Sequence, residues 1–325
     1  MQHTMWAVSA KFLTALLVVA MTALLHGQDE ATVRRLLDQL RSSDPLRRGE
    51  AARAILQVAP HATAAWPVFL EALLDANEEV RQTAGEALVR MGAKIVPELA
   101  RVLDGPSRTL KRRVAVVLGQ MGSNALDAVP ALEKALRDED GEARVFAALA
   151  LVRIAPQRAD LVPILEPLLQ DTEPRLRVAL VYAVEPLAQR HREALSLLEK
   201  ALNDAAADVR LAAVAVLGRL AEAAQPTVPA LQKRLADEHE LVRISAVSAL
   251  LSIGSTPSRE LVPILTKALS AQDATVRRAA VIVLQQTGPA GEAALADLKR
   301  LAQSDPDPVI RQLAEQTLLK LNQPR

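Results

Sequence analysis

The sequence predicts an all-α protein, an α-solenoid in which about nine two-helix repeats are stacked along one axis. Three observations predict it: a column of basic residues that recurs at a nearly constant interval, a proline column fourteen residues ahead of it, and a composition that is 50% hydrophobic with only six aromatic residues. An interval of about 33 residues is typical of stacked repeats, whose core lies between neighbouring units. A core of Leu, Val, Ala and Ile suits helices that pack closely on helices.

The basic column defines the second helix of each repeat, which we name helix B. Around Arg210, apolar or small residues stand one position before and three, six and seven positions after, at Val209, Ala213, Val216 and Leu217. These offsets place the side chains on one stripe of an α-helix. The members of the column are Arg48, Arg81, Lys111, Arg144, Arg177, Arg210, Arg243, Arg277 and Arg311.

The proline column marks the first helix of each repeat, named helix A. Proline has no backbone N–H, so it is expected either to begin this helix or to bend it. The prolines are Pro67, Pro97, Pro130, Pro163, Pro229 and Pro263, and Ser196 takes the place in one repeat.

A short acidic turn separates helix A from helix B. An aspartate stands six residues before the basic column in most repeats, where we expect it to cap the free amides of helix B and to face the positive end of the helix dipole. These aspartates are Asp75, Asp138, Asp171, Asp204, Asp237 and Asp305.

The pattern Val-Pro-x-Leu-x-x-x-Leu, the Asp turn and the pattern Val-Arg-x-x-Ala-x-x-Ala-Leu together resemble HEAT repeats of the short, lyase-like form, over about residues 29–321. The resemblance implies a right-handed αα superhelix, with B helices on the concave side and A helices on the convex side. It also implies that the basic and acidic columns pair as a ladder between repeats. Because nearly every repeat carries them, we interpret these residues as scaffold: Arg81, Arg144, Arg177, Arg210, Arg243, Arg277, Arg311, Asp138, Asp171, Asp204 and Asp237.

Residues 1–27 are predicted to be a signal peptide. The uncharged run Phe12–Leu25 is followed by an abruptly polar and acidic stretch. A membrane-spanning helix needs roughly 18–20 apolar residues, and this run is shorter, so a cleaved signal is favoured. An uncleaved anchor over residues 5–25 stays open, because Leu25 is larger than the small residue that a cleavage site prefers at that position. We therefore expect an exported protein, periplasmic or secreted, whose residues 28–325 form a single solenoid domain.

Charge and cysteine content narrow the function. The net charge is +1, whereas a protein that binds nucleic acid by neutralising phosphates shows a basic excess, so no nucleic-acid partner is expected. The absence of cysteine excludes disulfides, thiolate metal sites and cysteine nucleophiles. The densest basic patch, Lys111-Arg112-Arg113, is interpreted as a solvated helix face rather than a phosphate or acidic-partner site, because no aromatic residues accompany it.

No catalytic constellation is recognisable. The sequence has five histidines, no pair of them at metal-ligand spacing, no glycine-rich phosphate loop and no Gly-x-Ser-x-Gly motif. HEAT-like repeats also build a di-iron hydroxylase with repeated His-Glu pairs, but here the single pair is His239-Glu240, too few ligands for such a centre. We therefore expect that the protein is not an enzyme and has no catalytic residue, metal or cofactor. The alternative function is an enzyme or enzyme accessory of the hydroxylase or lyase type.

A candidate partner-binding surface lies opposite the core stripe of helix B. Counted from the basic column, positions one, five and eight residues later fall on the far side of the helix at 100° per residue. In the central repeats several of these residues are apolar, with Tyr182, the single tyrosine, as an anchor. The alternative is that adjacent B helices bury them, which solvent exposure decides. The function predicted is a non-catalytic scaffold of the cell envelope that holds a protein or peptide on its concave B-helix surface, through Val145, Leu149, Val178, Tyr182, Leu211 and Ile244.

Overall fold

The computed structural model describes residues 34–56 and 63–321. This part of the chain consists of helices and turns and contains no strand, which confirms the predicted all-α solenoid. The predicted signal peptide, residues 1–27, lies outside the described residues. Within them, no helix combines the length and the apolar character needed to cross a membrane.

The described residues group into two compact units, which divide between Pro156 and Gln157. A single solenoid domain from residue 28 onward stays a prediction. The division coincides with an irregular helix end. Four other B helices are followed by a residue with positive φ. The helix before the division is instead followed by Ala155, with φ −134° and ψ 56°, and then by a proline.

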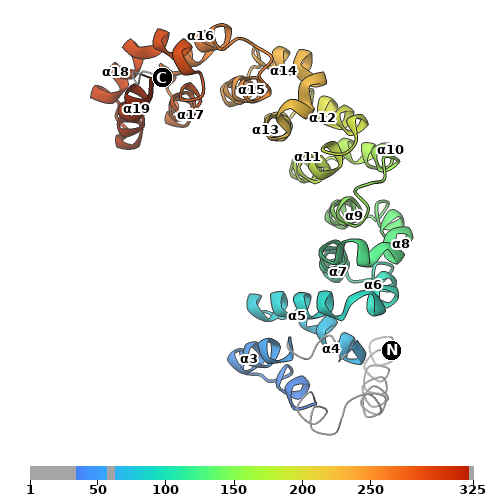
Figure 1. Ribbon diagram of the computed structural model, residues 1–325. Coiled ribbons are helices and arrows are strands. Elements are labelled where there is room, and N and C mark those ends of the chain that lie inside the picture. Colours follow the sequence, from blue (N-terminus) through green and yellow to red (C-terminus); the bar gives the residue numbers. More distant parts are fainter. Residues whose placement is uncertain (1–33, 57–62, 322–325) are drawn as a thin grey trace. The chain divides into compact units, whose positions relative to one another are not determined.

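Unit 1 is a two-layer array in which A and B helices alternate along the chain (Figure 1). Each B helix after the first packs on the B helix before it and on the A helix that precedes it in the chain. The B helices are α3 (Pro45–Ile55), α5 (Glu78–Met91), α7 (Arg108–Met121) and α9 (Gly141–Ile154). The A helices are α4 (Trp66–Ala72), α6 (Val96–Val102) and α8 (Val129–Ala135), each preceded by a 3₁₀ turn: η1 (Thr63–Ala65), η2 (Gly92–Ile95) and η3 (Gly122–Ala128).

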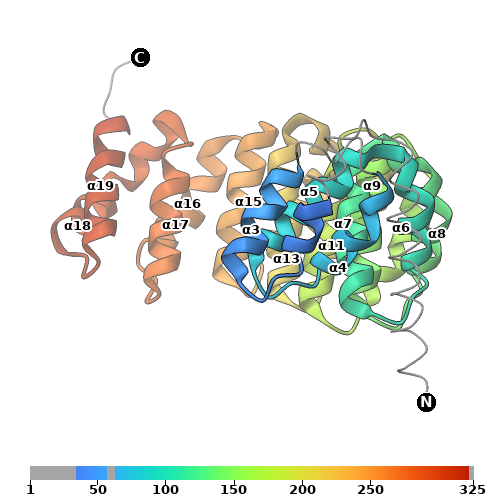
Figure 2. The same cartoon turned by 90° about the horizontal axis from the view of Figure 1, so that it is seen from below.

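Unit 2 repeats this arrangement, and Figure 2 shows its last four helices as two neighbouring pairs, α16 with α17 and α18 with α19. The B helices are α11 (Pro174–Ala188), α13 (Ala207–Leu220), α15 (Glu240–Ile253), α17 (Ala274–Leu284) and α19 (Pro308–Leu321). The A helices are α10 (Leu161–Leu165), continued by the 3₁₀ turn η4 (Glu166–Gln170), α12 (Leu195–Ala201), α14 (Val228–Arg234), α16 (Ser258–Ala268) and α18 (Leu295–Ser304). Three further 3₁₀ turns precede A helices: η5 (Arg192–Ala194), η6 (Ala221–Thr227) and η7 (Gly288–Ala294).

The prolines of the A helices act as helix starts in most repeats. Pro67, Pro97, Pro130 and Pro229 occupy the first turn, where the missing N–H removes no intrahelical bond. Pro263 instead lies inside α16, which begins five residues earlier. The prediction that each proline begins or bends helix A is confirmed at Pro67, Pro97, Pro130 and Pro229.

The predicted role of the acidic turn is wrong in one detail. Asp75 does not cap α5; its Oδ1 accepts a hydrogen bond from the N–H of Asn77 at 2.8 Å, and it is Asn77 whose side chain caps the helix by accepting from Glu79 N–H. The aspartate therefore shapes the turn that leads into the helix, as an Asx turn does. Asp138, Asp171, Asp204, Asp237 and Asp305 accept a bond from the N–H two residues later in the same way.

The predicted core stripe of helix B is confirmed. In α13, Val209, Ala213, Val216 and Leu217 are fully buried. The B layers are close-packed enough that one position must be small: a Cβ added at Gly119 of α7 would lie 3.1 Å from Cα of Ala150 in α9. The equivalent Gly218 of α13 would place a Cβ 3.3 Å from Cα of Ala249 in α15.

Replacing Gly119 with leucine is expected to destabilise unit 1 by about 1–3 kcal/mol, because the side chain would force α7 and α9 apart. The matched control is Gln120→Leu, which changes the adjacent, exposed residue and is expected to shift the unfolding free energy by less than about 0.5 kcal/mol. Urea unfolding followed by circular dichroism measures both. Equal stability of the two variants would show that this helix contact is looser than the structure indicates.

Candidate functional site on the B-helix face

Residues of the basic column tie the repeats together. Arg210 donates from Nε and Nη2 to the carboxylate of Asp237 in the next repeat, at 2.9 and 2.8 Å. Its Nη1 donates to the backbone carbonyls of Asp204 and Ala205, in the turn ahead of its own helix. One guanidinium thus fixes its own turn and joins two repeats, which leaves it no free donor pair for a ligand.

Equivalent contacts recur along the chain. Further pairs between consecutive repeats are Arg48–Asp75, Lys111–Asp138, Arg177–Asp204 and Arg277–Asp305. The bond from the column arginine to the carbonyl six residues earlier is also made by Arg81, Arg144, Arg177, Arg243, Arg277 and Arg311. These residues carry the architecture.

Two members of the column have no acid in the next repeat. Six residues before the next basic residue, where the paired aspartate stands in other repeats, the chain has Gly105 after Arg81 and Ala271 after Arg243. Arg81 pairs instead with Glu78 of its own helix, and Arg243 with the glutamate three residues before it at 3.0 Å. The ladder is therefore interrupted once in each unit.

The predicted partner-binding residues do not share one environment. Val145 and Ile244, 4% and 2% exposed, are buried, so the prediction that they contact a partner is wrong. Ile244 lines a groove with Ile264 of α16, which belongs to the next repeat. The next repeat therefore covers this flank of α15, beside the core stripe. Leu149, Val178 and Leu211 are half-buried, and Tyr182 is 45% exposed.

The exposed side of the B helices is rotated from the predicted one. In most B helices of unit 2, exposed residues lie two positions before and five and nine positions after the basic column. The position one after the column is half-buried in α11 and α13 and buried in α15. The large hydrophobic side chains on this face are Tyr182 of α11, Ile282 of α17 and Val309 of α19, 45%, 44% and 48% exposed. We call this surface, over α11, α13, α15, α17 and α19, the B face of unit 2.

Tyr182 is held in place although it faces solvent. The guanidinium of Arg219, from α13, lies over its ring with Cζ 5.4 Å from the ring centroid. Arg219 is itself fixed, because its Nε and Nη2 donate to the two carboxylate oxygens of Glu185 at 2.9 and 2.6 Å. The bonds to Glu185, opposed by partial burial and assisted by the Glu185 charge and by Tyr182, raise the pKa of Arg219. A cation over an aromatic face stabilises the ring orientation, so Tyr182 presents a preordered surface.

Pro186 adds a backbone feature at the same place. It lies inside α11, four residues after Tyr182. Because proline has no N–H, the helical bond to the carbonyl of Tyr182 cannot form. The carbonyl of Tyr182 therefore lacks the hydrogen bond that a helix normally supplies from the N–H four residues later.

Tyr182 could be identified from the sequence, whereas Arg219, Glu185 and Pro186 were missed. One signal was available: Arg219 stands 34 residues after Glu185, one more than the 33 residues from Arg177 to Arg210, so the two residues lie at similar heights on neighbouring B helices. The ring–guanidinium contact depends on the lateral spacing of α11 and α13, which the sequence alone does not specify.

The basic patch of α7 contains three different environments. Lys111 pairs with Asp138 at 2.5 Å, and Arg112 pairs with Asp140 at 2.6 Å and with Glu142. Arg113 makes no hydrogen bond within the described part of the chain, and its Nη1 is buried. The prediction of a solvated helix face is therefore wrong for Lys111 and Arg112, which form ion pairs, and for Arg113, one nitrogen of which is buried.

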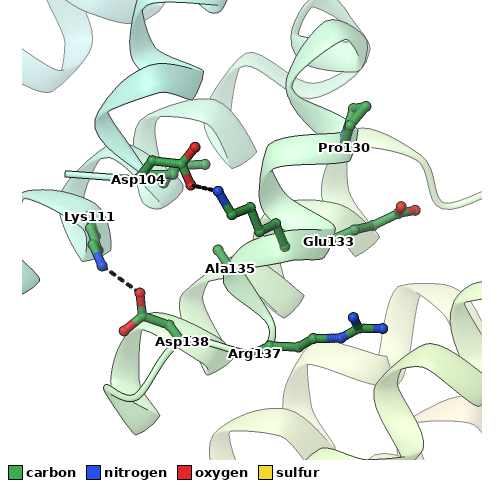
Figure 3. A pocket seen from close by; sticks show the side chains of 9 residues that line it. Asp104, Lys111, Pro130, Glu133, Ala135, Arg137 and Asp138 are labelled. Carbon is green, nitrogen blue, oxygen red and sulfur yellow. Dashed lines mark hydrogen bonds and ion pairs between the residues drawn. The ribbon is translucent and has the colours of Figure 1, made fainter.

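The largest groove near this patch is part of the repeat architecture. It has a volume of about 630 Å³ and lies between the ends of α6 and α8, where Lys134 reaches Asp104 and Lys111 reaches Asp138 (Figure 3). Grooves with the same type of lining recur in unit 2, beside Lys200 and beside Lys267. A groove that successive repeats reproduce gives no reason to place one specific ligand in it.

In the described residues, no group of three or more His, Asp or Glu side chains is placed to hold a metal ion. His239 directly precedes α15 and is exposed. The expectation that the protein uses no metal or cofactor stays a prediction.

Comparison with known proteins identifies the repeats. The family model described as HEAT repeats matches residues 96–185, 162–251 and 228–319. No protein in a search of curated proteins matches the chain.

Solved structures share the fold at low sequence identity. A structure of Kap95p bound to RanGDP matches with a TM-score of 0.61 and 15% identity, over 89% of this chain and 46% of that chain. The Escherichia coli protein YibA matches with a TM-score of 0.55 and 17% identity, over 87% of this chain and 99% of that chain. Kap121p matches with a TM-score of 0.52 and 15% identity, over 90% of this chain and 41% of that chain.

The chain spans less than half the length of the two Kap chains, and at these identities the likeness shows the fold alone. The family assignment rests on the repeats themselves, whose model matches more than half of the sequence. The two-layer helix pairs and the ladder between repeats agree with this match, and the protein belongs to the HEAT-repeat family.

Proposed function

We propose that this protein is a non-catalytic scaffold of the cell envelope that binds a protein or peptide on the B face of unit 2, around Tyr182. The observation that carries the proposal is the exposed tyrosine ring held by Arg219, whose cation lies 5.4 Å from the ring centroid. Fixed aromatic side chains with a polar end are frequent anchors of protein interfaces.

The surroundings of Tyr182 support a polypeptide partner. The ring supplies apolar area, and the Glu185–Arg219 pair beside it supplies charged groups of both signs. Apolar cores with polar surroundings are characteristic of interfaces between proteins. HEAT-repeat solenoids typically bind rather than catalyse, and Kap95p, which shares the fold, binds RanGDP.

The location in the cell envelope rests on the amino-terminal sequence. The uncharged run Phe12–Leu25 followed by acidic residues is typical of an export signal. Cell fractionation and mass measurement of the mature chain test this part. Loss of residues 1–27 supports a cleaved signal, and an intact cytoplasmic chain contradicts the proposed location.

The binding surface can be tested by photocrosslinking in intact cells. With p-benzoylphenylalanine in place of Tyr182, we expect a specific crosslinked product, which mass spectrometry then identifies. The matched control places the same group at Pro229, an exposed residue of helix A α14. Capture from position 229 without capture from position 182 would move the interface to the A-helix side.

With the purified partner, Tyr182→Ala is expected to weaken binding by about thirtyfold or more, the effect of losing an interface anchor of about 2 kcal/mol. The control is Leu126→Ala in η3 of unit 1, a residue of nearly equal exposure outside the B face of unit 2, which is expected to leave the affinity unchanged. Isothermal titration calorimetry gives both affinities. An unchanged affinity of the Tyr182 variant would contradict the proposed anchor.

A further inference from the structure

A second surface, in unit 1, carries an unbalanced positive charge. A groove of about 280 Å³ lies between the B helices α5 and α7. Its floor is apolar, formed by Leu73, Val116 and Val117, and its walls carry Arg81 and Arg113. This groove differs from those between the repeat ends, because the ladder of acid and base does not fill it.

Arg113 is the residue that makes the groove unusual. It is half-buried, its Nη1 is enclosed, and no acceptor in the described residues takes a hydrogen bond from its guanidinium. Burial and the nearby charge of Arg81 lower its pKa. An enclosed guanidinium nitrogen without a hydrogen-bond partner costs stability, and an acceptor that enters the groove from outside would offset this cost.

Arg81 adds a second cation because the ladder is interrupted there. In an intact pair, Nε and Nη2 of the arginine bind an aspartate of the next repeat, but the residue at that position, six before Lys111, is Gly105. Arg81 is balanced by Glu78, which also accepts from Gln82 at 3.0 Å. With one acid and two guanidinium groups lining the groove, a single positive charge is left over.

We propose that this groove binds the carboxylate of an acidic side chain in a partner polypeptide, with Arg113 as the main contact and Arg81 beside it. The inference rests on the proposed scaffold function and names a second contact surface for it. A carboxylate accepts two parallel bonds from a guanidinium, the strongest pairing available to Arg113.

The size and lining favour a side chain over other anions. A volume of about 280 Å³ is near the lower end of ligand pockets, which run from about 300 to 1,000 Å³, and suits one or two side chains. The apolar floor fits the methylene groups of a glutamate and an apolar neighbour. A nucleic-acid strand would need aromatic stacking platforms, and the residues that line the groove include none.

The test uses the full-length protein and two fluorescein-labelled pentapeptides, one with a glutamate between two leucines and one with glutamine in its place. Fluorescence anisotropy is expected to show at least tenfold tighter binding of the glutamate peptide, because only its carboxylate can form a charge-assisted hydrogen bond with both partners ionised. Arg113→Gln is expected to abolish this preference. Arg108→Gln, which removes the same charge from an exposed position of α7, is expected to change it less than twofold.

Equal binding of the two peptides, no binding at millimolar concentration, or an unchanged preference in Arg113→Gln overturns the proposal. A second measurement separates a binding residue from a structural one. Arg113→Met, which replaces an unpaired guanidinium with an apolar chain of similar length, is expected to raise the midpoint of thermal unfolding while it abolishes the glutamate preference. A lowered midpoint would mean that Arg113 supports the fold, which contradicts the proposal.

These outcomes are independent of the test at Tyr182. If photocrosslinking at position 182 captures a partner while the peptides show no preference, the scaffold function stands and the acidic contact fails. If neither site captures anything, the proposed function itself fails.

Discussion

Replacing Asp237 with alanine is expected to lower the free energy of unfolding by about 3–5 kcal/mol, the cost of leaving a buried charge without its partner. The side chains of Arg210 and Asp237 are 5% and 2% exposed, which makes this the most buried pair of the ladder among the described residues. Asp237 also accepts from Arg234 at 3.2 Å and from the N–H of His239. The substitution therefore removes four hydrogen bonds and leaves Arg210 enclosed.

Circular dichroism and tryptophan fluorescence can locate the effect. No tryptophan lies beyond residue 66, so tryptophan fluorescence reports on the amino-terminal part of the chain, whereas circular dichroism reports on all helices. Asp237 lies in unit 2. In urea, Asp237→Ala is expected to shift the dichroism transition more than the fluorescence transition.

Two further variants control this prediction. Asp297→Ala breaks a pair with Arg300 whose side chains are 34% and 49% exposed, and is expected to cost less than about 1 kcal/mol. The double variant Arg210→Met with Asp237→Leu removes both charges and is expected to recover most of the loss. If Asp237→Ala costs no more than Asp297→Ala, the ladder does not hold the repeats together.

The sequence was sufficient for the features that depend on one repeat at a time. The core stripe of α13 and the starts of α4, α6, α8 and α14 follow from helix periodicity and from the missing N–H of proline. The spacing of 27 residues from Arg210 to Asp237 also identifies the bonded pair, since it is the repeat length less the offset of the acid. Local pattern and repeat length together specify these contacts.

The candidate site was only partly predictable, because it depends on how neighbouring helices pack. A helical wheel treats helix B alone and places Ile244 opposite the core, but the next repeat covers that flank. The same wheel cannot distinguish Lys111, which reaches an acid, from Arg113, which does not. Exposure and pairing are properties of the stack, and the offsets in one helix do not contain them.

Acid is expected to unfold the protein over a narrow range, because the ladder aspartates lose their charge together. Burial alone would raise the pKa of Asp75, Asp138, Asp204 and Asp237, but the bonds from the partner cation and from a backbone N–H, with the nearby positive charges, lower it overall. For Asp305 the bond from its arginine is the largest effect, and its pKa is also lowered. Arginine stays charged throughout, so the pH dependence comes from the acids.

The direction of the pH effect follows from linkage. An aspartate in the unfolded chain titrates at about pH 3.9, and these groups titrate at lower pH in the folded protein. The unfolded state therefore binds protons first, so the stability that the ladder contributes is complete above about pH 5 and is lost as the pH falls through about 4 toward the folded pKa values. Protonation breaks a charged pair in each affected repeat, and because each repeat is stable only against its neighbours, the losses add along each unit.

Urea midpoints measured between about pH 8 and pH 2 are thus expected to stay level to about pH 5 and then to fall steeply. The variant Arg210→Met with Asp237→Leu has one such acid fewer, and its midpoint is expected to fall less steeply. Added salt at neutral pH is expected to have a small effect, since salt screens buried pairs much less than exposed ones. A midpoint that stays level to about pH 3, or that salt at neutral pH lowers as much as acid does, would show that surface charges rather than the ladder determine the stability of the stack.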